Sequence, residues 1–431
     1  MKYVNDKSFL TMLQKYTKLL ALVICTAYFL NSCSRVGASK PYVAGTIVVG
    51  DDSLIVENDD QQIPRRPMQM GIERLYLVVD SLKGKRVAVV GNQTSVVKKT
   101  HLVDTLLSLK VNVTKVFSPE HGFRGEADAG EKVNSSIDKK TGLPLVSLYG
   151  NHKKPTVQDF ENVDVVIFDI QDVGVRFYTY ISTLHYVMEA CAEQQKPLIV
   201  LDRPNPNAHY IDGPVMKEEW KSFVGMHKVP IVYGMTIGEY AKMINGEGWL
   251  ANGAKCALWV VPIRNYNHRT PYSLPVAPSP NLRSDRAIEL YPSLCLFEGT
   301  TVSLGRGTEK PFEVFGHPNF KNTPYTFVPK SVPGAKTPPQ LNNVCYGYDL
   351  SNEQVGRLNR INLQYLLEAR RLLGDSAILI DQKSFFNKLA GTEKLAEQIM
   401  QMLSEDEIRN SWQPEIDSFK QVRAKYLMYK D

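Results

Sequence analysis

The sequence predicts an α/β protein whose larger part is a doubly wound domain with a mostly parallel sheet. Three observations predict this fold class. Runs of β-branched and apolar residues alternate with helical periodicity between residues 86 and 206. The run VDVVIFDIQD (163–172) is almost continuously apolar, as expected of a central strand buried on both faces. The loops after these strands are rich in Gly, Pro, Asn and Asp, and in such sheets ligands bind outside the carboxyl ends of the strands.

The predicted strands alternate with helices along the first part of the chain, and further helices follow towards the C-terminus. Helices are predicted at 101–109, at about 179–194 and from Thr236 to Gly246. A proline-rich stretch then leads to a mixed region, in which 291–316 holds a helical turn, a strand and a loop. Amphipathic helices are predicted at 361–373, 394–403 and 407–429. The predicted strands are RVAVVGN (86–92), VNVTKVFSP (111–119), VDVVIFDIQD (163–172), PLIVLDRPNP (197–206) and ALWVVPIRNY (257–266).

Residues 1–32 are predicted to be a signal peptide. Lysines precede the run LLALVICTAYFLNSC, whose apolar part is too short for a comfortable membrane span. Leu30, Asn31, Ser32 and Cys33 match a bacterial lipobox, so Cys33 is the expected lipidated N-terminus. The alternative is an ordinary signal peptide with an incidental cysteine. Residues 33–67 are predicted to be a tether. The expected location is the membrane, with the protein on the periplasmic face, because no acidic cluster follows the cysteine.

Composition excludes several classes of partner and cofactor. The net charge is +6, but residues 1–32 carry four lysines against one aspartate, so the remainder gives no electrostatic case for nucleic acid. The sequence has no HExxH, no dinucleotide fingerprint and no phosphate loop, and its histidines never pair at ligand spacing. We therefore expect no metal and no other cofactor. The cysteines that follow Cys33 lie in apolar contexts without CxxC spacing, which predicts buried free thiols.

The string SPEHGFRGEADAGEKV (118–133) begins at the end of the second predicted strand and contains a candidate catalytic acid. Glu120 and His121 directly follow a strand end and a proline, in a loop shaped by glycines. Glycoside hydrolysis needs a carboxylic acid that donates a proton to the leaving oxygen. We predict Glu120 as this acid, with His121 beside it. The alternative is a loop glutamate that caps a nearby helix.

The string DIQDVGVRFYTYIST offers the next candidates. Asp169 lies inside the apolar strand and Asp172 at its exit, and a buried aspartate is costly unless it is paired. Arg176 either forms a structural ion pair with one of them or grips a substrate carboxylate. Asp172 is the predicted second catalytic group, with Glu298 as its rival, and Tyr178 or Tyr180 is expected to stack on a sugar.

Further predicted substrate-binding residues lie in the loops after strands and in the mixed region. Asn205 sits between two prolines and Asn281 follows Pro280 on a rigid loop, and a scaffold role is the alternative for both. An esterase or amidase with Ser118 or Ser182 as nucleophile is a rival that lacks a G-x-S-x-G elbow. The full predicted set is Asn92, Arg124, Arg176, Tyr178, Asn205, Asn281, Glu298, Arg306 and Glu313.

These strings together resemble the exo-β-N-acetylmuramidase family. The matching segments run in the family's order from about residue 71 to the C-terminus. Two loops depart from its pattern: Ala208-His209 stands where the family usually has glycine, and Arg283 where proline is commoner. The matching segments include SPEHGFRGEADAGEKV, FDIQDVGVRFYTYISTL, VLDRPNPN, YGMTIGEYAKMINGEGW, PSPNL and YPSLCLFEGTTVSLGRGTEKPFEVFG.

The resemblance implies a Rossmann-like catalytic domain without a nucleotide (68–275) and a smaller C-terminal α/β domain (276–431). It implies release of N-acetylmuramic acid from the non-reducing end of peptidoglycan fragments, with Glu120 as the acid. The lactyl carboxylate of that sugar needs a cation, for which Arg124, Arg176 and Arg306 are candidates. A non-catalytic muropeptide-binding lipoprotein is the alternative.

Overall fold

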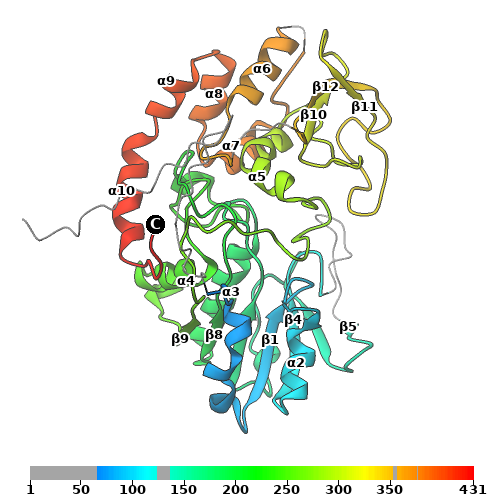
Figure 1. The fold of residues 1–431 in the computed structure, drawn as a ribbon. Coiled ribbons are helices and arrows are strands. Elements are labelled where there is room, and N and C mark those ends of the chain that lie inside the picture. Colours follow the sequence, from blue (N-terminus) through cyan, green and yellow to red (C-terminus); the bar gives the residue numbers. More distant parts are fainter. Residues whose placement is uncertain (1–65, 124–135, 353–356, 376) are drawn as a thin grey trace, which may run out of the picture. The chain divides into compact units, whose positions relative to one another are not determined.

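The main sheet is made of short apolar strands. The computed structural model describes residues 66–123, 136–352, 357–375 and 377–431, and in these residues seven strands pair in the order β5-β6-β4-β1-β7-β8-β9 (Figure 1). All neighbours pair in parallel except β5 and β6. The strands are β1 (Arg86–Gly91), β4 (Asn112–Ser118), β5 (Ser136–Ile137), β6 (Pro144–Ser147), β7 (Val165–Asp169), β8 (Leu198–Leu201) and β9 (Leu258–Val261).

This strand order confirms the predicted doubly wound sheet. Counted along the chain, the six parallel strands run 3-2-1-4-5-6, the order of dinucleotide-binding domains. All five predicted strands are present, whereas β5 and β6 were not predicted. The order reverses between β1 and β7, so the loops after β1, β4 and β7 converge at the carboxyl edge of the sheet.

Both faces of the sheet are covered, which explains the continuous apolar runs. In β1, Val87 and Val89 belong to one core cluster and Ala88 and Val90 to the other, as the two-residue period of a strand requires. The first cluster is closed by η1 (Gly71–Leu77), η2 (Val79–Leu82) and α2 (Leu102–Ser108). The second is closed by α3 (Tyr180–Glu193) and α4 (Ile237–Gly246). Figure 1 shows α2 beside β1 and β4.

Helix boundaries follow their caps. Thr236 forms a capping box with Glu239 at the start of α4, as its position before the apolar period predicts. Two helices were not predicted: α5 (Asp285–Leu294), which contains Pro292, and α7 (Lys383–Ala390). The remaining helices are η3 (Gln158–Phe160), η4 (Glu218–Trp220), η5 (Ala251–Gly253), η6 (Cys295–Gly299), α6 (Gln364–Leu373), α8 (Lys394–Met400), α9 (Glu405–Asn410) and α10 (Gln413–Ala424).

The C-terminal part shares its core with the sheet. A three-stranded antiparallel sheet, β10 (Val314–His317), β12 (Cys345–Asp349) and β11 (Tyr325–Phe327), lies beside α5 (Figure 1). One cluster of buried side chains runs from the sheet through α5 to α10. The tail after α10 returns to the sheet, where the Tyr429 hydroxyl donates to Asp202 Oδ2 at 2.6 Å. A short hairpin joins β2 (Val96–Val97) to β3 (Thr100–His101). The predicted division near residue 275 stays a prediction.

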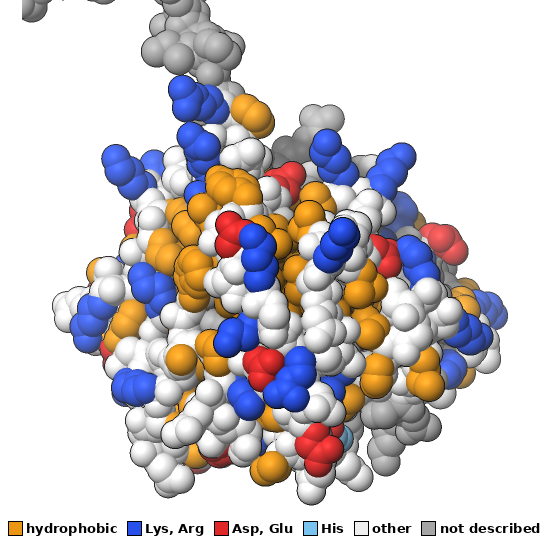
Figure 2. Space-filling view, turned by 90° about the horizontal axis from the view of Figure 1, so that it is seen from below, with side chains coloured by type: hydrophobic (Ala, Val, Ile, Leu, Met, Phe, Trp, Pro, Cys, Tyr) orange, Lys and Arg blue, Asp and Glu red, His pale blue; other side chains and the backbone are white. Residues whose placement is uncertain are grey.

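The surface and the cysteines complete the comparison with the sequence. The four cysteines in the described part of the chain are free and buried, as predicted. On the face shown in Figure 2, lysines and arginines are spread among hydrophobic and uncharged side chains. Within the same described residues, no helix has the length and apolar character needed to cross a membrane. The predicted signal peptide, Cys33 and most of the tether lie outside the described residues.

Candidate active site

The loop after β4 turns sharply and places Glu120 at the carboxyl edge of the sheet. His121 and Gly122 both have positive φ, at 68° and 76°, and the Gly122 amide donates to the Pro119 carbonyl at 3.0 Å. Glycine adopts this conformation without strain, whereas histidine does so less readily. His121 is 7% exposed and Glu120 is half-buried. The backbone therefore holds both side chains at the point where the strand ends.

Two hydroxyl groups hold the Glu120 carboxylate. Thr179, which precedes α3, donates from Oγ1 to Glu120 Oε2 at 2.9 Å. Tyr149, two residues after β6, forms a hydrogen bond with the same carboxylate. Burial, followed by the charge of Glu120, raises the pKa of Tyr149, so this phenol stays protonated and can donate. Loops after β4, β6 and β7 thus meet at one carboxyl group.

Glu120 lines a cavity of about 310 Å³. Three of its buried aromatic side chains form an edge-to-face series: Phe177 and Tyr291 have ring centroids 5.3 Å apart, and Tyr291 and Phe312 have centroids 5.0 Å apart. A pocket that combines aromatic rings with a few convergent polar groups is typical of a small-molecule site. Its lining comprises Glu120, His121, Tyr149, Phe177, Tyr178, Thr179, Tyr180, Phe223, Val224, Ser279, Asn281, Leu282, Tyr291, Glu298, Arg306, Phe312 and Phe385.

A second carboxylate, Glu298, lines the same cavity and is paired with Arg306. Arg306 reaches Glu298 Oε1 from Nε at 3.0 Å and from Nη2 at 2.5 Å. Its guanidinium carbon lies 5.0 Å from the centre of the Phe312 ring. Burial opposes the charge of Arg306, but the Glu298 carboxylate outweighs burial and raises the arginine pKa. The pair fixes one carboxylate and one cation in the cavity wall.

The glycines around Arg306 explain the string GRG. Gly305 and Gly307 both have φ of 81°. A Cβ at Gly305 would lie 2.5 Å from the Lys310 carbonyl oxygen, and one at Gly307 would lie 2.3 Å from that of Lys330. Only glycine fits these two positions, so the turn presents Arg306 in one orientation.

Asn281 and Tyr178 also line the cavity, and backbone carbonyls hold both. Asn281 Nδ2 donates to the Gly334 carbonyl at 2.8 Å. The Tyr178 and Tyr180 hydroxyls both donate to the Pro278 carbonyl, at 2.9 and 3.2 Å. The two tyrosine rings meet edge to face, with centroids 4.8 Å apart. These residues therefore shape the wall of the cavity with fixed rings.

Arg176 was predicted to grip a substrate carboxylate, and its placement shows that prediction to be wrong. The side chain is fully buried and donates to four backbone carbonyls, at 2.7 to 2.9 Å. Burial lowers the pKa of Arg176 to about 9. The alternative, an ion pair with a strand aspartate, is also wrong, because Arg203 holds Asp169 through Nε at 2.6 Å and Nη2 at 2.9 Å. The carbonyl acceptors of Arg176 belong to Pro214, Val229, Leu389 and Ala390.

Asp172, the predicted second catalytic group, does not line the cavity. It is 2% exposed, and its Oδ2 accepts from the Tyr233 hydroxyl and from the Gly174 amide at 2.8 Å. Burial raises the pKa of Asp172 to about 6, against its hydrogen bonds. Because Glu298 lines the cavity and Asp172 does not, the structure favours the rival assignment of the second carboxylate.

Three predicted substrate-binding residues do not line the cavity, and their side chains bind other protein groups. Asn92 Nδ2 donates to the Tyr180 hydroxyl at 2.9 Å and so supports a lining residue. Asn205 Nδ2 donates to the Met235 carbonyl at 2.8 Å. Glu313 accepts from the Ser284 hydroxyl, which caps α5. Arg124 lies outside the described residues.

Sequence reasoning missed several lining residues. Tyr149 follows β6, which was not predicted, and Phe385 lies on α7, which was also missed. Phe223 lies in an irregular segment where no periodicity marks it. Of the rival nucleophiles, Ser118 is buried in β4, and Ser182 donates from Oγ to the Phe223 carbonyl at 2.7 Å. In the described ranges no three His, Cys, Asp or Glu side chains are grouped to hold a metal ion.

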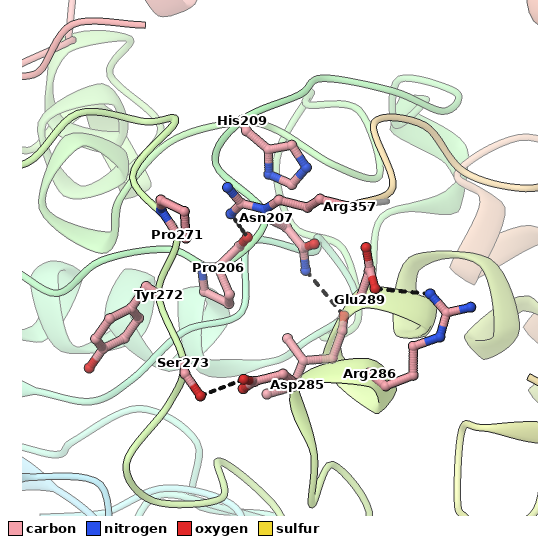
Figure 3. Close-up of a pocket in the computed structure, with 11 residues that line it drawn as sticks. Pro206, Asn207, His209, Pro271, Tyr272, Ser273, Asp285, Arg286, Glu289 and Arg357 are labelled. Atoms are coloured by element: carbon pink, nitrogen blue, oxygen red, sulfur yellow. Dashed lines mark hydrogen bonds and ion pairs between the residues drawn. The ribbon is translucent and has the colours of Figure 1, made fainter. Parts of the chain in front are cut away.

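A larger cavity, of about 540 Å³, is lined by both ends of the segment 271–286 and by His209 and Arg357 (Figure 3). Its polar side chains are largely committed to neighbours. Ser273 donates to Asp285, Arg286 donates to Glu289 at 2.9 Å, and Asn207 donates to the Ile288 carbonyl at 3.2 Å. Neither Glu120 nor Glu298 lines it. We therefore place the chemistry in the smaller cavity.

Comparisons with known proteins match nearly the whole described chain. Family models described as the N-terminal and C-terminal parts of the exo-β-N-acetylmuramidase NamZ match residues 87–286 and 289–429. The peptidoglycan β-N-acetylmuramidase NamZ of Bacillus subtilis (strain 168) is 38% identical over 408 residues, covering 89% of this chain and 96% of that protein. Two crystal structures of DUF1343 family proteins from Bacteroides fragilis NCTC 9343 are similar, with identities of 46% and 29% and TM-scores of 0.78 and 0.72. Each comparison covers 85% of this chain and all of the other.

Proposed function

The chain belongs to the NamZ exo-β-N-acetylmuramidase family, and from this premise we propose how its cavity performs the family's reaction. The protein is a glycoside hydrolase that releases N-acetylmuramic acid from the non-reducing end of peptidoglycan fragments. A small cavity walled by buried aromatic rings suits the binding of one terminal sugar at a time.

The observation that carries the assignment is the presence of Glu120 and Glu298 in one cavity. Glycosidases use two carboxyl groups that flank the bond to be cleaved. In our proposal Glu120 donates a proton to the bridging oxygen, with Thr179 and Tyr149 fixing its position. Glu298, which lines the same cavity, either attacks the anomeric carbon as the nucleophile or activates the water that attacks this carbon.

Arg306 is the cation that we assign to the lactyl carboxylate of the sugar. Two of its nitrogens, Nε and Nη2, bind Glu298, which leaves Nη1 as the donor for a substrate anion. A guanidinium can bridge two carboxylates because its donors point in fixed directions. This role replaces the one predicted for Arg176.

The decisive experiment is hydrolysis of the disaccharide in which N-acetylmuramic acid is linked to N-acetylglucosamine. The wild-type protein should release both sugars, and longer glycans should yield free N-acetylmuramic acid first. Glu120→Gln should reduce release to below a few per cent and leave the melting temperature nearly unchanged. Tight binding without turnover by the wild type would instead support a muropeptide-binding protein.

We also propose that the mature protein is a lipoprotein on the periplasmic face of the membrane. The support is the lipobox that ends at Cys33 and the apolar run before it. Cys33→Ser should move the protein from the membrane fraction to the soluble fraction and abolish incorporation of labelled fatty acid. Retention of the variant in membranes would contradict the proposal.

A further inference from the structure

A two-residue turn places Phe223 at the rim of the cavity. Ser222 and Gly225 exchange backbone hydrogen bonds at 3.0 Å, so Phe223 and Val224 form the tip of the turn. A Cβ at Gly225 would lie 2.2 Å from the Met216 methyl group, so a side chain there would require Met216 to move. The hydroxyl of Ser182, a fully buried residue of α3, donates to the Phe223 carbonyl at 2.7 Å. The tip is therefore fixed to the helix before any ligand arrives.

The Phe223 ring is supported on its outer side. The Lys153 ammonium lies 4.5 Å from the ring centroid, and Lys153 does not line the cavity, so it backs the ring from outside. The attraction of a cation for an aromatic face holds both side chains. Phe223 and Val224 are half-buried, whereas the lining rings of Tyr291 and Phe312 are buried. The turn thus belongs to the part of the cavity wall that reaches the surface.

Phe223 lies on the same side of the cavity as the catalytic acid. Its ring centroid is 6.3 Å from that of Tyr149, whose hydroxyl binds Glu120. A general acid protonates the oxygen that joins the two sugars, so a half-buried lining residue close to the acid lies near the sugar that leaves. We propose that Phe223, with Val224 beside it, forms the apolar wall that binds the leaving-group sugar. This inference rests on the proposed function. It adds Phe223 as the residue that favours substrates in which a second sugar follows the terminal one.

The experiment compares two substrates that share the terminal sugar. One is the natural disaccharide, and the other is the β-fluoride of N-acetylmuramic acid, whose leaving group is too small to reach the rim. Phe223→Ala should lower kcat/KM for the disaccharide about tenfold, in keeping with the loss of one aromatic contact, and leave the fluoride rate unchanged. Phe223→Leu, which keeps apolar bulk, should show a smaller loss on the disaccharide alone.

Trp259→Ala is the matched control, because Trp259 is an exposed aromatic residue on β9 outside the cavity. It should change neither rate. Equal losses on both substrates, or no loss on the disaccharide, would overturn the inference while the proposed function stands. A wild-type protein inactive on both substrates would overturn the proposed function and this inference with it. Melting temperatures of all variants separate misfolding from loss of binding.

Discussion

Thr179 donates a hydrogen bond of 2.9 Å to Glu120 and thereby joins the loop after β4 to the start of α3. The two residues lie in the connections that follow β4 and β7, the strands that flank β1 on either side of the point where the strand order reverses. Doubly wound sheets generally bind their ligands in the crevice where the strand order reverses. In this protein the hydrogen bond fixes the orientation of a carboxyl group in that crevice. This geometry leads to predictions about catalysis, specificity and stability.

Loss of the Thr179 hydroxyl should slow the reaction more than it weakens binding. A hydrogen bond to a charged group contributes about 1.5–3 kcal/mol, so Thr179→Val should lower kcat at least about tenfold with little change in KM. Thr179→Ser should restore most of the rate; failure of this rescue would show that the methyl group matters instead.

The two candidates for the second carboxylate can be separated by isosteric variants. Glu298→Gln should lower kcat by at least about 100-fold, the usual contribution of a catalytic acid or base. Asp172→Asn should retain most of the activity, because Asp172 does not line the cavity. Initial rates on the natural disaccharide measure both. An inactive but folded Asp172→Asn protein would reverse the assignment.

Arg306 should determine the preference for N-acetylmuramic acid over N-acetylglucosamine, which lacks the lactyl carboxylate. Arg306→Met should raise KM for muramyl substrates and reduce the ratio of kcat/KM between the two sugars by about tenfold or more. Because Arg306 also binds Glu298, kcat should fall as well. A variant with an unchanged ratio would show that another group reads the carboxylate.

Arg176 should contribute to stability and not to specificity. Its removal takes a donor away from four buried carbonyls, of which only that of Val229 also accepts from the Met216 amide, so Arg176→Met should lower the free energy of unfolding by at least about 3 kcal/mol. Arg371→Met is the matched control, because that side chain is 60% exposed and its ion pair with Glu368 lies at the surface. Urea unfolding measures both variants. A similarly small loss of unfolding free energy in both variants would contradict a structural role for Arg176.

The buried Asp172 carboxyl predicts a pH-dependent stability. Burial raises its pKa from 3.8 to about 6, so the folded state favours the protonated form. The corresponding stabilisation, about 3 kcal/mol at most, is present below pH 3.8 and is lost as the pH rises through 6. The melting temperature of Asp172→Asn relative to wild type should therefore increase between pH 4 and pH 7. A constant difference would show that Asp172 titrates normally.

The strands were predictable because burial on both faces demands β-branched and apolar residues in sequence. β6 was missed because it is short and begins with Pro144, and α5 because Pro292 interrupts its pattern. The position of Glu120 in the site could be predicted because a strand, a proline and glycines surround it in the sequence. The role of Arg176 could not be predicted, because a buried arginine that binds only carbonyls has the same sequence context as one that faces a ligand.

The arrangement of the cavity wall has a consequence for biogenesis. Glu120 comes from the first third of the chain, and Phe385 on α7 comes from the last, and Arg176 ties the end of α7 to the loops that follow the sheet. A nascent polypeptide lacks part of this wall. The complete cavity, and with it the proposed hydrolysis, is therefore acquired only after the whole chain has been synthesised.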